Sequence, residues 1–226
     1  MLPPENPWLG VPADEYEGHM NAVGQSAALR EIFGRVVAEA RPRRVAVLGC
    51  GVGGDLALLD PDRVEGAAGV DVNPCYLELA RARLPELAPR LTLICGDVLD
   101  VELPQLPDEG RYDLIHAALL LEHVEPLPLL RRIEAWLGPS GVCSLVTQEP
   151  TADQPAVTET PFASLRALAP HMKVRAAGEI AALADEAGFA LGARRAVKLP
   201  TGKTLVSSLF DKARKTLGRR RGYARC

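Results

Sequence analysis

The chain has 226 residues, of which 47% are hydrophobic and 24% are charged, and its formal net charge is -3. The length predicts one α/β domain with a large core, and the composition is that of an ordinary globular protein, which excludes extensive disorder. The small negative charge gives no general attraction to nucleic acid, so no nucleic-acid partner is expected.

The first residues and the cysteines predict the compartment. No basic segment followed by an apolar core opens the sequence, and no apolar run is long enough to cross a bilayer. Five cysteines form no CxxC pair, and Cys95 and Cys143 stand in apolar runs typical of strands. We therefore expect a cytoplasmic protein with no membrane contact and no bound metal, in which these cysteines are reduced and buried.

Residues 1–25 are predicted to form an irregular arm that can act as a lid. Four prolines interrupt this segment, and Trp8, Tyr16 and Met20 are its expected anchors. Residues 26–40 then place apolar side chains at helical spacing, with Ser26 as the expected N-cap. A helix should therefore precede the first strand.

The chain is organised around residues 45–59. The unbroken apolar run from Val45 to Leu48 predicts a buried parallel strand, and the leucines from Leu56 onward predict a helix after it. Between them lies a glycine cluster, which permits positive φ and lets main chain approach a ligand closely. A strand, a glycine turn and a helix are typical of a site for a nucleotide-like cofactor.

Strands alternate with helices through the rest of the core. Further strands are expected at 67–72, 91–95, 112–118 and 142–147, with helices starting at Asn73-Pro74 and covering 127–137 and 177–187, and with a turn at 139–141. This alternation predicts a doubly wound, mostly parallel sheet covered on both faces. Residues 189–199 and 204–210 flank a short turn, so they should form a terminal antiparallel hairpin.

Two segments lie outside this alternation of strands and helices. Residues 150–176 form the longest interruption between core elements, and we interpret them as a substrate cap. Phe162, Leu165, Leu168 and Met172 would then provide an apolar wall, although a short helix that caps the core fits equally well. The basic C-terminal tail at 212–226 is most simply a solvated end.

The glycine turn leaves the cofactor open between two classes. Gly49 to Gly54 satisfy the G-x-G-x-x-G pattern of dinucleotide-binding dehydrogenases. Asp71, at the end of the second strand, is placed to accept hydrogen bonds from two ribose hydroxyls in NAD and in other adenosine cofactors alike. Asp55 would lie in the first helical turn, where its carboxylate disfavours a pyrophosphate but tolerates a sulfonium and an ammonium group. Alternatively, Asp55 complements the helix dipole and points into solvent.

Five motifs together resemble a known family. They are Leu48–Gly53, Val70–Asn73, Gly96–Val98, Tyr112–Ile115 with Leu121–Val124, and the closing strand pair. In this order they look like a class I S-adenosylmethionine-dependent methyltransferase over about residues 26–211. The resemblance implies a Rossmann-like, seven-stranded sheet whose last strand is inserted antiparallel. It also implies S-adenosylmethionine as cofactor and S-adenosylhomocysteine as product.

The resemblance assigns cofactor contacts to the first half of the domain. Gly49, Gly51 and Gly53 would line the methionine part of the cofactor, and Asp71 would hold the ribose hydroxyls. Tyr16 is similar to a tyrosine that closes an N-terminal lid over the cofactor in some small-molecule members. These assignments are carried over by position in the motifs.

Further contacts follow from the next two strands. By resemblance, Asp97 would accept from the adenine amino group, and Val72 and Val98 would enclose the ring. Ala117 and Ala118 would offer main chain near the methionine amine.

The sequence departs from the family at one place. Val47 stands where an acidic residue usually precedes the glycines. This weakens the expected anchoring of the cofactor's amine, for which Asp55 is a candidate replacement.

Methyl transfer from a sulfonium is an in-line displacement that needs alignment in a dry pocket and, for a hydroxyl acceptor, removal of a proton. We take His123, Glu149 and His19 as the candidate catalytic residues. His123 follows the fourth strand at the ligand-binding edge, and Glu149, beyond the fifth strand, is expected to face the substrate pocket. His171 is a further candidate base, whereas His116, within an apolar strand, is expected to be a core residue.

The sequence therefore predicts a methyltransferase, monomeric or homodimeric, that acts on a small-molecule metabolite. An NAD-dependent oxidoreductase and a non-catalytic module that binds an adenosine cofactor are the alternatives.

Overall fold

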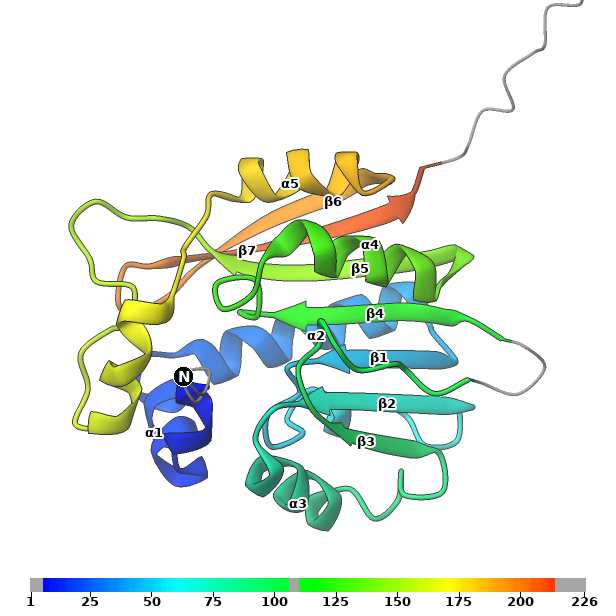
Figure 1. Ribbon diagram of the computed structural model, residues 1–226, viewed down its shortest axis with the longest axis horizontal. Helices are drawn as coiled ribbons and strands as arrows, with labels where there is room; N and C mark the ends of the chain where they lie inside the picture. Colours follow the sequence, from blue (N-terminus) through cyan, green and yellow to red (C-terminus); the bar gives the residue numbers. More distant parts are fainter. Residues whose placement is uncertain (1–5, 106–109, 214–226) are drawn as a thin grey trace, which may run out of the picture.

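The computed structural model describes residues 6–105 and 110–213 (Figure 1). Its centre is a seven-stranded sheet in the order β3-β2-β1-β4-β5-β7-β6. The strands are β1 (Arg44–Leu48), β2 (Gly66–Asp71), β3 (Leu91–Cys95), β4 (Tyr112–Ala118), β5 (Leu137–Gln148), β6 (Phe189–Lys198) and β7 (Thr204–Lys212). β1 to β5 pair in parallel, and β7 lies antiparallel between β5 and β6. The predicted α/β, mostly parallel sheet with its terminal hairpin is confirmed.

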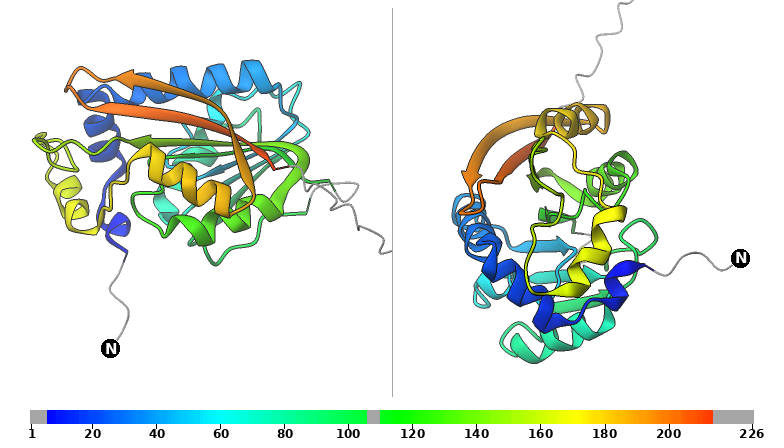
Figure 2. Two further views of the ribbon diagram at one scale, coloured as in Figure 1. Left: turned by 90° about the horizontal axis from the view of Figure 1, so that it is seen from above. Right: turned by 90° about the vertical axis from the view of Figure 1, so that its left-hand side faces the viewer.

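Helices cover both faces of the sheet (Figure 2). They are α2 (Gln25–Ala40) and α3 (Pro74–Arg83) on one face, and α4 (Pro126–Trp136) and α5 (Ala177–Glu186) on the other. Val47 of β1 packs in one layer with Phe33 of α2, and Leu48 packs in the other with Leu129 of α4. Successive residues of β1 therefore enter opposite cores, which explains why all four residues after Arg44 are apolar.

Two segments far apart in the sequence meet beyond the carboxyl ends of the parallel strands (Figures 1 and 2). The first is α1 (Ala13–Ala22) with the short 3₁₀ helix before it (Pro7–Gly10), and the second is the 3₁₀ helix Ala163–His171. The Ser164 N–H and hydroxyl donate to the Glu15 carboxylate at 3.0 and 2.7 Å. The arm and the cap thus form one roof over the edge where such folds bind ligands.

The N-terminal half of the domain needs three corrections. The arm is helical from Ala13 to Ala22 rather than irregular, because no proline follows Pro12 within it. α2 begins at Gln25 after Gly24, whose φ of 77° only glycine adopts readily, so Ser26 is not the N-cap. The leucines after the glycine turn form a three-residue 3₁₀ helix, Leu56–Leu58, so Asp55 does not open an α-helix.

Two expectations about the strands are also wrong. Cys95 is exposed because β3 is an edge strand with a half-buried face, whereas Cys143 in β5 is buried as expected. Residues 139–141 belong to β5, whose pairing with β4 shifts register there, and do not form a separate turn. The predicted bounds of the other strands and helices agree with the structure to within a few residues.

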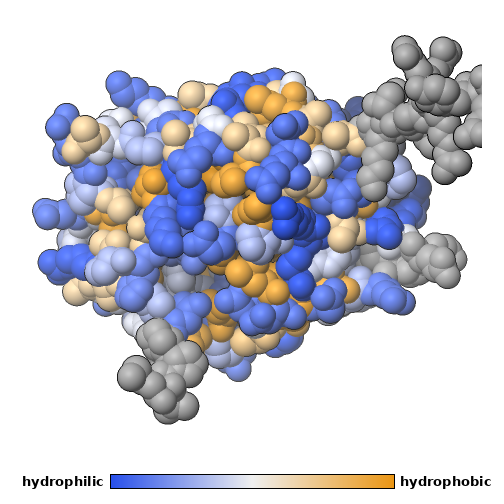
Figure 3. All heavy atoms as spheres, turned by 45° about the horizontal axis from the view of Figure 1, so that its top comes forward, coloured by the Kyte–Doolittle hydropathy of each residue, from blue (hydrophilic) through white to orange (hydrophobic). Residues whose placement is uncertain are grey.

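The outer surface adds little to these conclusions. In the ranges 6–105 and 110–213, the helices lack the length and apolar character needed to cross a bilayer. Figure 3 shows hydrophilic and hydrophobic side chains interspersed on the face that it presents, as on most folded domains. The predicted basic tail lies outside the described residues from position 214 onward.

Candidate active site

A cavity of about 680 Å³ lies under the roof formed by the arm and the cap. Its volume falls within the range of small-ligand sites. Most of the site residues predicted from the sequence line it, namely Tyr16, His19, Gly49, Gly51, Asp55, Asp71, Val72, Asp97, Val98, Ala118 and His123. The fold therefore brings together residues spread over more than a hundred positions of the chain.

The glycine loop after β1 forms one wall of the cavity. Gly49, Gly51 and Gly53 have φ angles of 67°, 53° and 86°, which favour glycine. Gly49 and Gly51 line the cavity, but Gly53 does not. A Cβ on Gly53 would lie 3.0 Å from Leu84 and 3.1 Å from Ala80, both in or next to α3. Gly53 thus lets the loop pack on α3, which corrects the expectation that it lines the cofactor site.

Asp71, the last residue of β2, is fixed by two main-chain donors. Gly51 N donates to its Oδ2 at 2.8 Å, and Asn73 N donates to its Oδ1 at 2.9 Å. Burial raises the pKa of the Asp71 carboxyl, while these donors act in the opposite direction. A carboxylate has more acceptor positions than these two bonds use, so Asp71 can also accept from ligand hydroxyls.

The ends of β2 and β3 place a second group of side chains side by side. Asp71 pairs in register with Cys95, so the residues that follow each strand are neighbours. Val72 and Val98 both line the cavity, as does Asp97, whose Oδ1 accepts from Leu99 N at 2.8 Å. Two apolar side chains and one acidic side chain therefore line this part of the cavity.

Tyr16 of α1 reaches the glycine loop. A Cβ on Gly51 would lie 3.4 Å from its hydroxyl oxygen, and its ring stacks on Tyr76 with centroids 5.4 Å apart. Burial, followed by the nearby carboxylates of Asp55 and Asp71, raises the pKa of the Tyr16 phenol. The phenol therefore stays protonated near neutral pH and can donate a hydrogen bond.

Contacts with α3 hold the arm in this position. The Tyr76 hydroxyl donates to Val11 O at 3.0 Å, and Arg83 donates to both carboxylate oxygens of Glu17 at 2.7 and 2.9 Å. Such a two-point pair fixes orientation better than a single contact.

Asp55 lines the cavity from the loop after β1. Its Oδ2 lies 3.6 Å from Nε2 of His116, whose Nδ1 is hydrogen-bonded to Ser144 Oγ at 2.9 Å. His116 is fully buried, as expected, and is the register partner of Val47 on the neighbouring strand. Position 47 has no acidic side chain, but the Asp55 carboxylate of the loop lies at the cavity.

The end of β4 departs in part from the prediction. Ala118 lines the cavity, but Ala117 is buried within the sheet and does not. Leu119 and Leu120 line it instead, and Leu119 has a φ of 53°, which turns the chain away from the strand. Sequence reasoning missed Leu119 because nothing in an apolar run marks a leucine at positive φ.

Three of the candidate bases, all histidines, line the cavity. The His123 ring packs edge-on against Trp8 with centroids 5.1 Å apart, and burial lowers the pKa of His123 to about 4. His19 is hydrogen-bonded through Nδ1 to Thr160 Oγ1 at 2.9 Å, and burial lowers its pKa as well. Both imidazoles are therefore mainly neutral at pH 7, so each has an acceptor nitrogen, but the lowered pKa also makes each a weaker base than a free imidazole. His171 also lines the cavity.

Glu149 does not face the cavity. Its Oε1 accepts from Ala177 N at 3.0 Å, so it satisfies a free N–H group at the start of α5. This corrects the expectation that Glu149 faces the substrate pocket.

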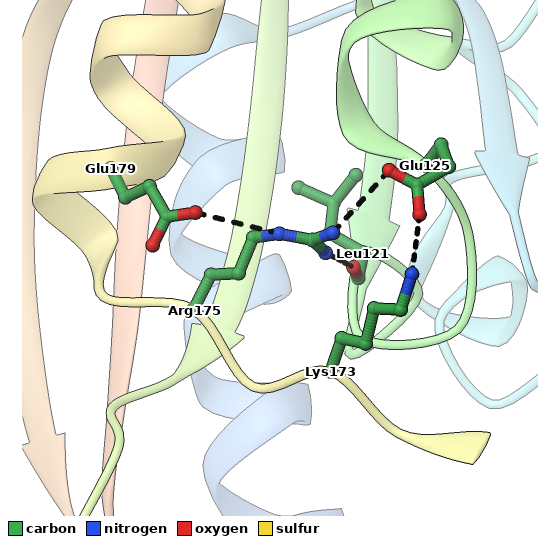
Figure 4. Close-up of polar contacts among 5 residues, drawn as sticks. All are labelled: Leu121, Glu125, Lys173, Arg175 and Glu179. Carbon is green, nitrogen blue, oxygen red and sulfur yellow. Dashed lines mark hydrogen bonds and ion pairs between the residues drawn. The ribbon is translucent and has the colours of Figure 1, made fainter.

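Charged residues before α5 hold the loop that follows β4 (Figure 4). Arg175 donates to Leu121 O at 3.3 Å and pairs with Glu125 and Glu179 at 3.4 and 3.5 Å. Lys173 pairs with Glu125 at 2.7 Å. Because the Arg175 side chain is 15% exposed, its contacts contribute more than the solvent-exposed pair of Lys173. The end of the cap is thereby joined to the loop that carries the candidate base.

Glu122, next to that base, is a buried acid to which the sequence assigned no role. Gln148 N donates to its Oε1 at 2.9 Å, and Oε2 has no partner in the described part of the chain. Burial raises the pKa of Glu122 to about 7. At neutral pH, a carboxyl group with a pKa near 7 is present in comparable amounts as the protonated acid and as the carboxylate.

A family model described as a methyltransferase domain matches residues 19–193 of the chain, which is well over half of its length. The chain belongs to this family. Its fold is Rossmann-like.

One relative found by sequence is also named as a methyltransferase. A trans-aconitate 2-methyltransferase from Methylobacterium radiotolerans is 36% identical over 119 residues, which are 51% of this chain and 41% of that protein. The match thus spans less than half of the relative's length.

Solved structures share the fold. The N-methyltransferase NodS from Bradyrhizobium japonicum, crystallised with S-adenosylhomocysteine, has a TM-score of 0.63 at 14% identity, with 83% of this chain and 87% of that chain covered. The [4+2]-cyclase SpnF has a TM-score of 0.60 at 16% identity, with 80% and 81% covered. Because SpnF is named for a different reaction, the fold alone does not define the chemistry.

The packing role of Gly53 can be tested against its neighbour. Gly53→Ala should lower the free energy of unfolding in urea by roughly 1–2 kcal/mol, because a Cβ is strained at positive φ and meets α3. Gly54→Ala, where a Cβ would meet nothing within 4 Å, is the control and should cost far less. Equal losses from the two substitutions would contradict the packing role.

The raised pKa of Glu122 predicts a pH dependence of stability. Between pH 4.5 and about 7 the folded chain keeps a proton that the unfolded chain loses, so the contribution of Glu122 to stability falls as pH rises. Glu122→Gln removes this titration. The unfolding free energy of the variant relative to the parent should therefore rise by roughly 3 kcal/mol from pH 4.5 to pH 7.5. A difference that stays constant with pH would show that Glu122 titrates normally.

Proposed function

We propose that this methyltransferase transfers the methyl group of S-adenosylmethionine to a small-molecule acceptor by in-line displacement. The observation that carries the proposal is the Asp71 carboxylate, fixed by Gly51 N and Asn73 N on the cavity wall. Asp55 and Asp97 line the same cavity. Three carboxylates suit a ligand with hydroxyl, amino and cationic groups, and they disfavour a pyrophosphate.

The loop geometry gives a second argument against a dinucleotide. Pyrophosphates bind at the N-terminus of the helix that follows the glycines, where free N–H groups converge. Here a three-residue 3₁₀ helix follows them, and Asp55 precedes it. Residues 49–59 therefore do not provide the α-helix N-terminus at which a dinucleotide pyrophosphate binds, and this disfavours the oxidoreductase alternative.

The residues fit the cofactor as follows. We infer that Asp71 would accept from the ribose hydroxyls and that Asp97 would accept from the adenine amino group, with Val72 and Val98 on the two sides of the ring. When bound, S-adenosylmethionine supplies a methyl group on a sulfonium that leaves as a thioether.

The methionine end would lie over the glycine loop. Main chain at Gly49, Gly51 and Ala118 would border it, and Asp55 would accept from its ammonium group. Tyr16 would cover the loop, since its phenol lies over Gly51.

A small acceptor suits the roof over the cavity. The arm and the cap are joined through Glu15 and Ser164 and through His19 and Thr160, so a bulky acceptor would require these contacts to break. Leu165 and Leu168 of the cap add apolar wall that helps to exclude water. The relative named for trans-aconitate supports the same size class.

The neutral imidazoles of His123 and His19 are the groups that could take a proton from a hydroxyl or amine acceptor. His123 lies on the loop after β4, beside the cavity. The cytoplasmic location and the monomer or homodimer state stay predictions.

Calorimetry with S-adenosylhomocysteine and with NADH tests the cofactor assignment. We expect S-adenosylhomocysteine to bind and NADH not to bind. Asp71→Ala should weaken the binding roughly tenfold to a hundredfold, because buried ribose hydroxyls lose their acceptor. Asp100→Ala, at an exposed position, serves as the control. Binding of NADH alone would refute the proposal.

A pair of ligands can isolate the role of Asp55. Asp55→Asn should weaken S-adenosylhomocysteine about tenfold or more, because the ammonium group loses a charged acceptor. The affinity for 5′-methylthioadenosine, which has no amino-acid part, should stay the same, whereas Asp71→Ala should weaken both ligands. If Asp55→Asn leaves both affinities unchanged, its carboxylate does not contact the cofactor.

A further inference from the structure

The charge of the cavity wall changes along the sheet. Asp55, Asp71 and Asp97 follow β1, β2 and β3, which form one half of the strand order. Lys203 precedes β7 and Gln148 ends β5, on the other half. The proposed function places the cationic cofactor on the acidic half. The basic half is then left for the acceptor.

Lys203 is buried without a counter-ion. Its side chain is 3% exposed, and its Nζ donates to Ala156 O at 2.7 Å. Within residues 6–105 and 110–213, no carboxylate oxygen lies within 4.0 Å of this ammonium group. Its positive charge also contributes, after burial, to the lowered pKa of His19. A buried, uncompensated cation is costly unless an anion joins it, and the carbonyl occupies one of its three N–H groups.

Arg30 adds a second cation to the same half. It lines the cavity from α2, and in the described ranges no carboxylate pairs with it. The N-terminal part of α2 lies over this half because Ala28 packs with Val146 of β5 and Leu205 of β7. Gln148 Nε2, which donates to Ala156 O at 3.2 Å, provides a neutral donor group nearby.

We propose that the acceptor is a small carboxylic acid in its anionic form and that Lys203 and Arg30 bind its carboxylate. The inference rests on the proposed function and names the substrate class of the same site. Ammonium and guanidinium groups bind carboxylates through charge-assisted hydrogen bonds. The aspartates on the opposite half would repel the same group, so the charge pattern fixes which end of the acceptor faces away from the cofactor.

The test is calorimetry on the full chain saturated with S-adenosylhomocysteine. The probes are trans-aconitate, succinate and the uncharged trimethyl ester of trans-aconitate. We expect at least one acid to bind and the ester to bind at least tenfold more weakly. Arg30→Gln and Lys203→Met should each weaken the acid at least tenfold and leave the affinity for S-adenosylhomocysteine within twofold of the parent.

Lys198→Met is the matched control, because Lys198 is an exposed lysine of β6 that does not line the cavity. It should leave the affinity for the acid unchanged. Lys203 also holds Ala156, so thermal unfolding with S-adenosylhomocysteine will show whether Lys203→Met folds. Arg30 is exposed, and Arg30→Gln keeps the proposal testable if the lysine variant does not fold.

The outcomes separate the two proposals. If S-adenosylhomocysteine does not bind, the proposed function fails. If it binds but neither acid binds, or the ester binds as well as the acids, or the acid affinity is the same in the parent and in Arg30→Gln, the carboxylate site is refuted and methyl transfer stands. Loss of acid affinity in Lys198→Met as well would show general charge attraction and would also refute the site.

Discussion

The hydrogen bond from Gly51 N to the Asp71 carboxylate joins the loop after β1 to the end of β2, and the rest of the site is built around it. The bond offsets part of the cost of burying Asp71, and the positive φ of Gly51 turns the chain that follows it. Tyr16 closes over this contact, and Asp55 leaves the same loop toward the cavity. One backbone donor thereby sets the position of several groups that face a ligand.

Sequence patterns predicted the parts of the fold that local physics determines. Apolar runs flanked by glycine or Asn73-Pro74 predicted the parallel strands and α3, and the closing hairpin followed from its short turn. Asp71 and Asp97 were located because the end of a parallel strand is a fixed place in such a sheet. These residues line the cavity as expected.

The errors arose where tertiary contacts decide the outcome. Glu149 follows a strand end, but its carboxylate accepts from Ala177 N at the start of α5 instead of facing the cavity. Gly53 belongs to the glycine pattern, yet its lack of a side chain serves packing on α3. Lys203 sits in a short polar turn that carries no sign of burial, because its surroundings come from residues near 156 and from β5. No local pattern could have shown these partners.

The reversed direction of β7 has a geometric consequence for the site. Each strand that runs parallel to β1 ends at the edge of the sheet where the cavity lies. It begins at the opposite edge, about one strand length away. β7 runs antiparallel to β5, so it starts at the cavity edge, where Thr204 O accepts from Glu149 N just after the end of β5. The tight turn before β7, which contains Lys203, therefore lies at the cavity. Inverting a single strand is enough to bring the last part of the domain into a pocket otherwise composed of earlier segments.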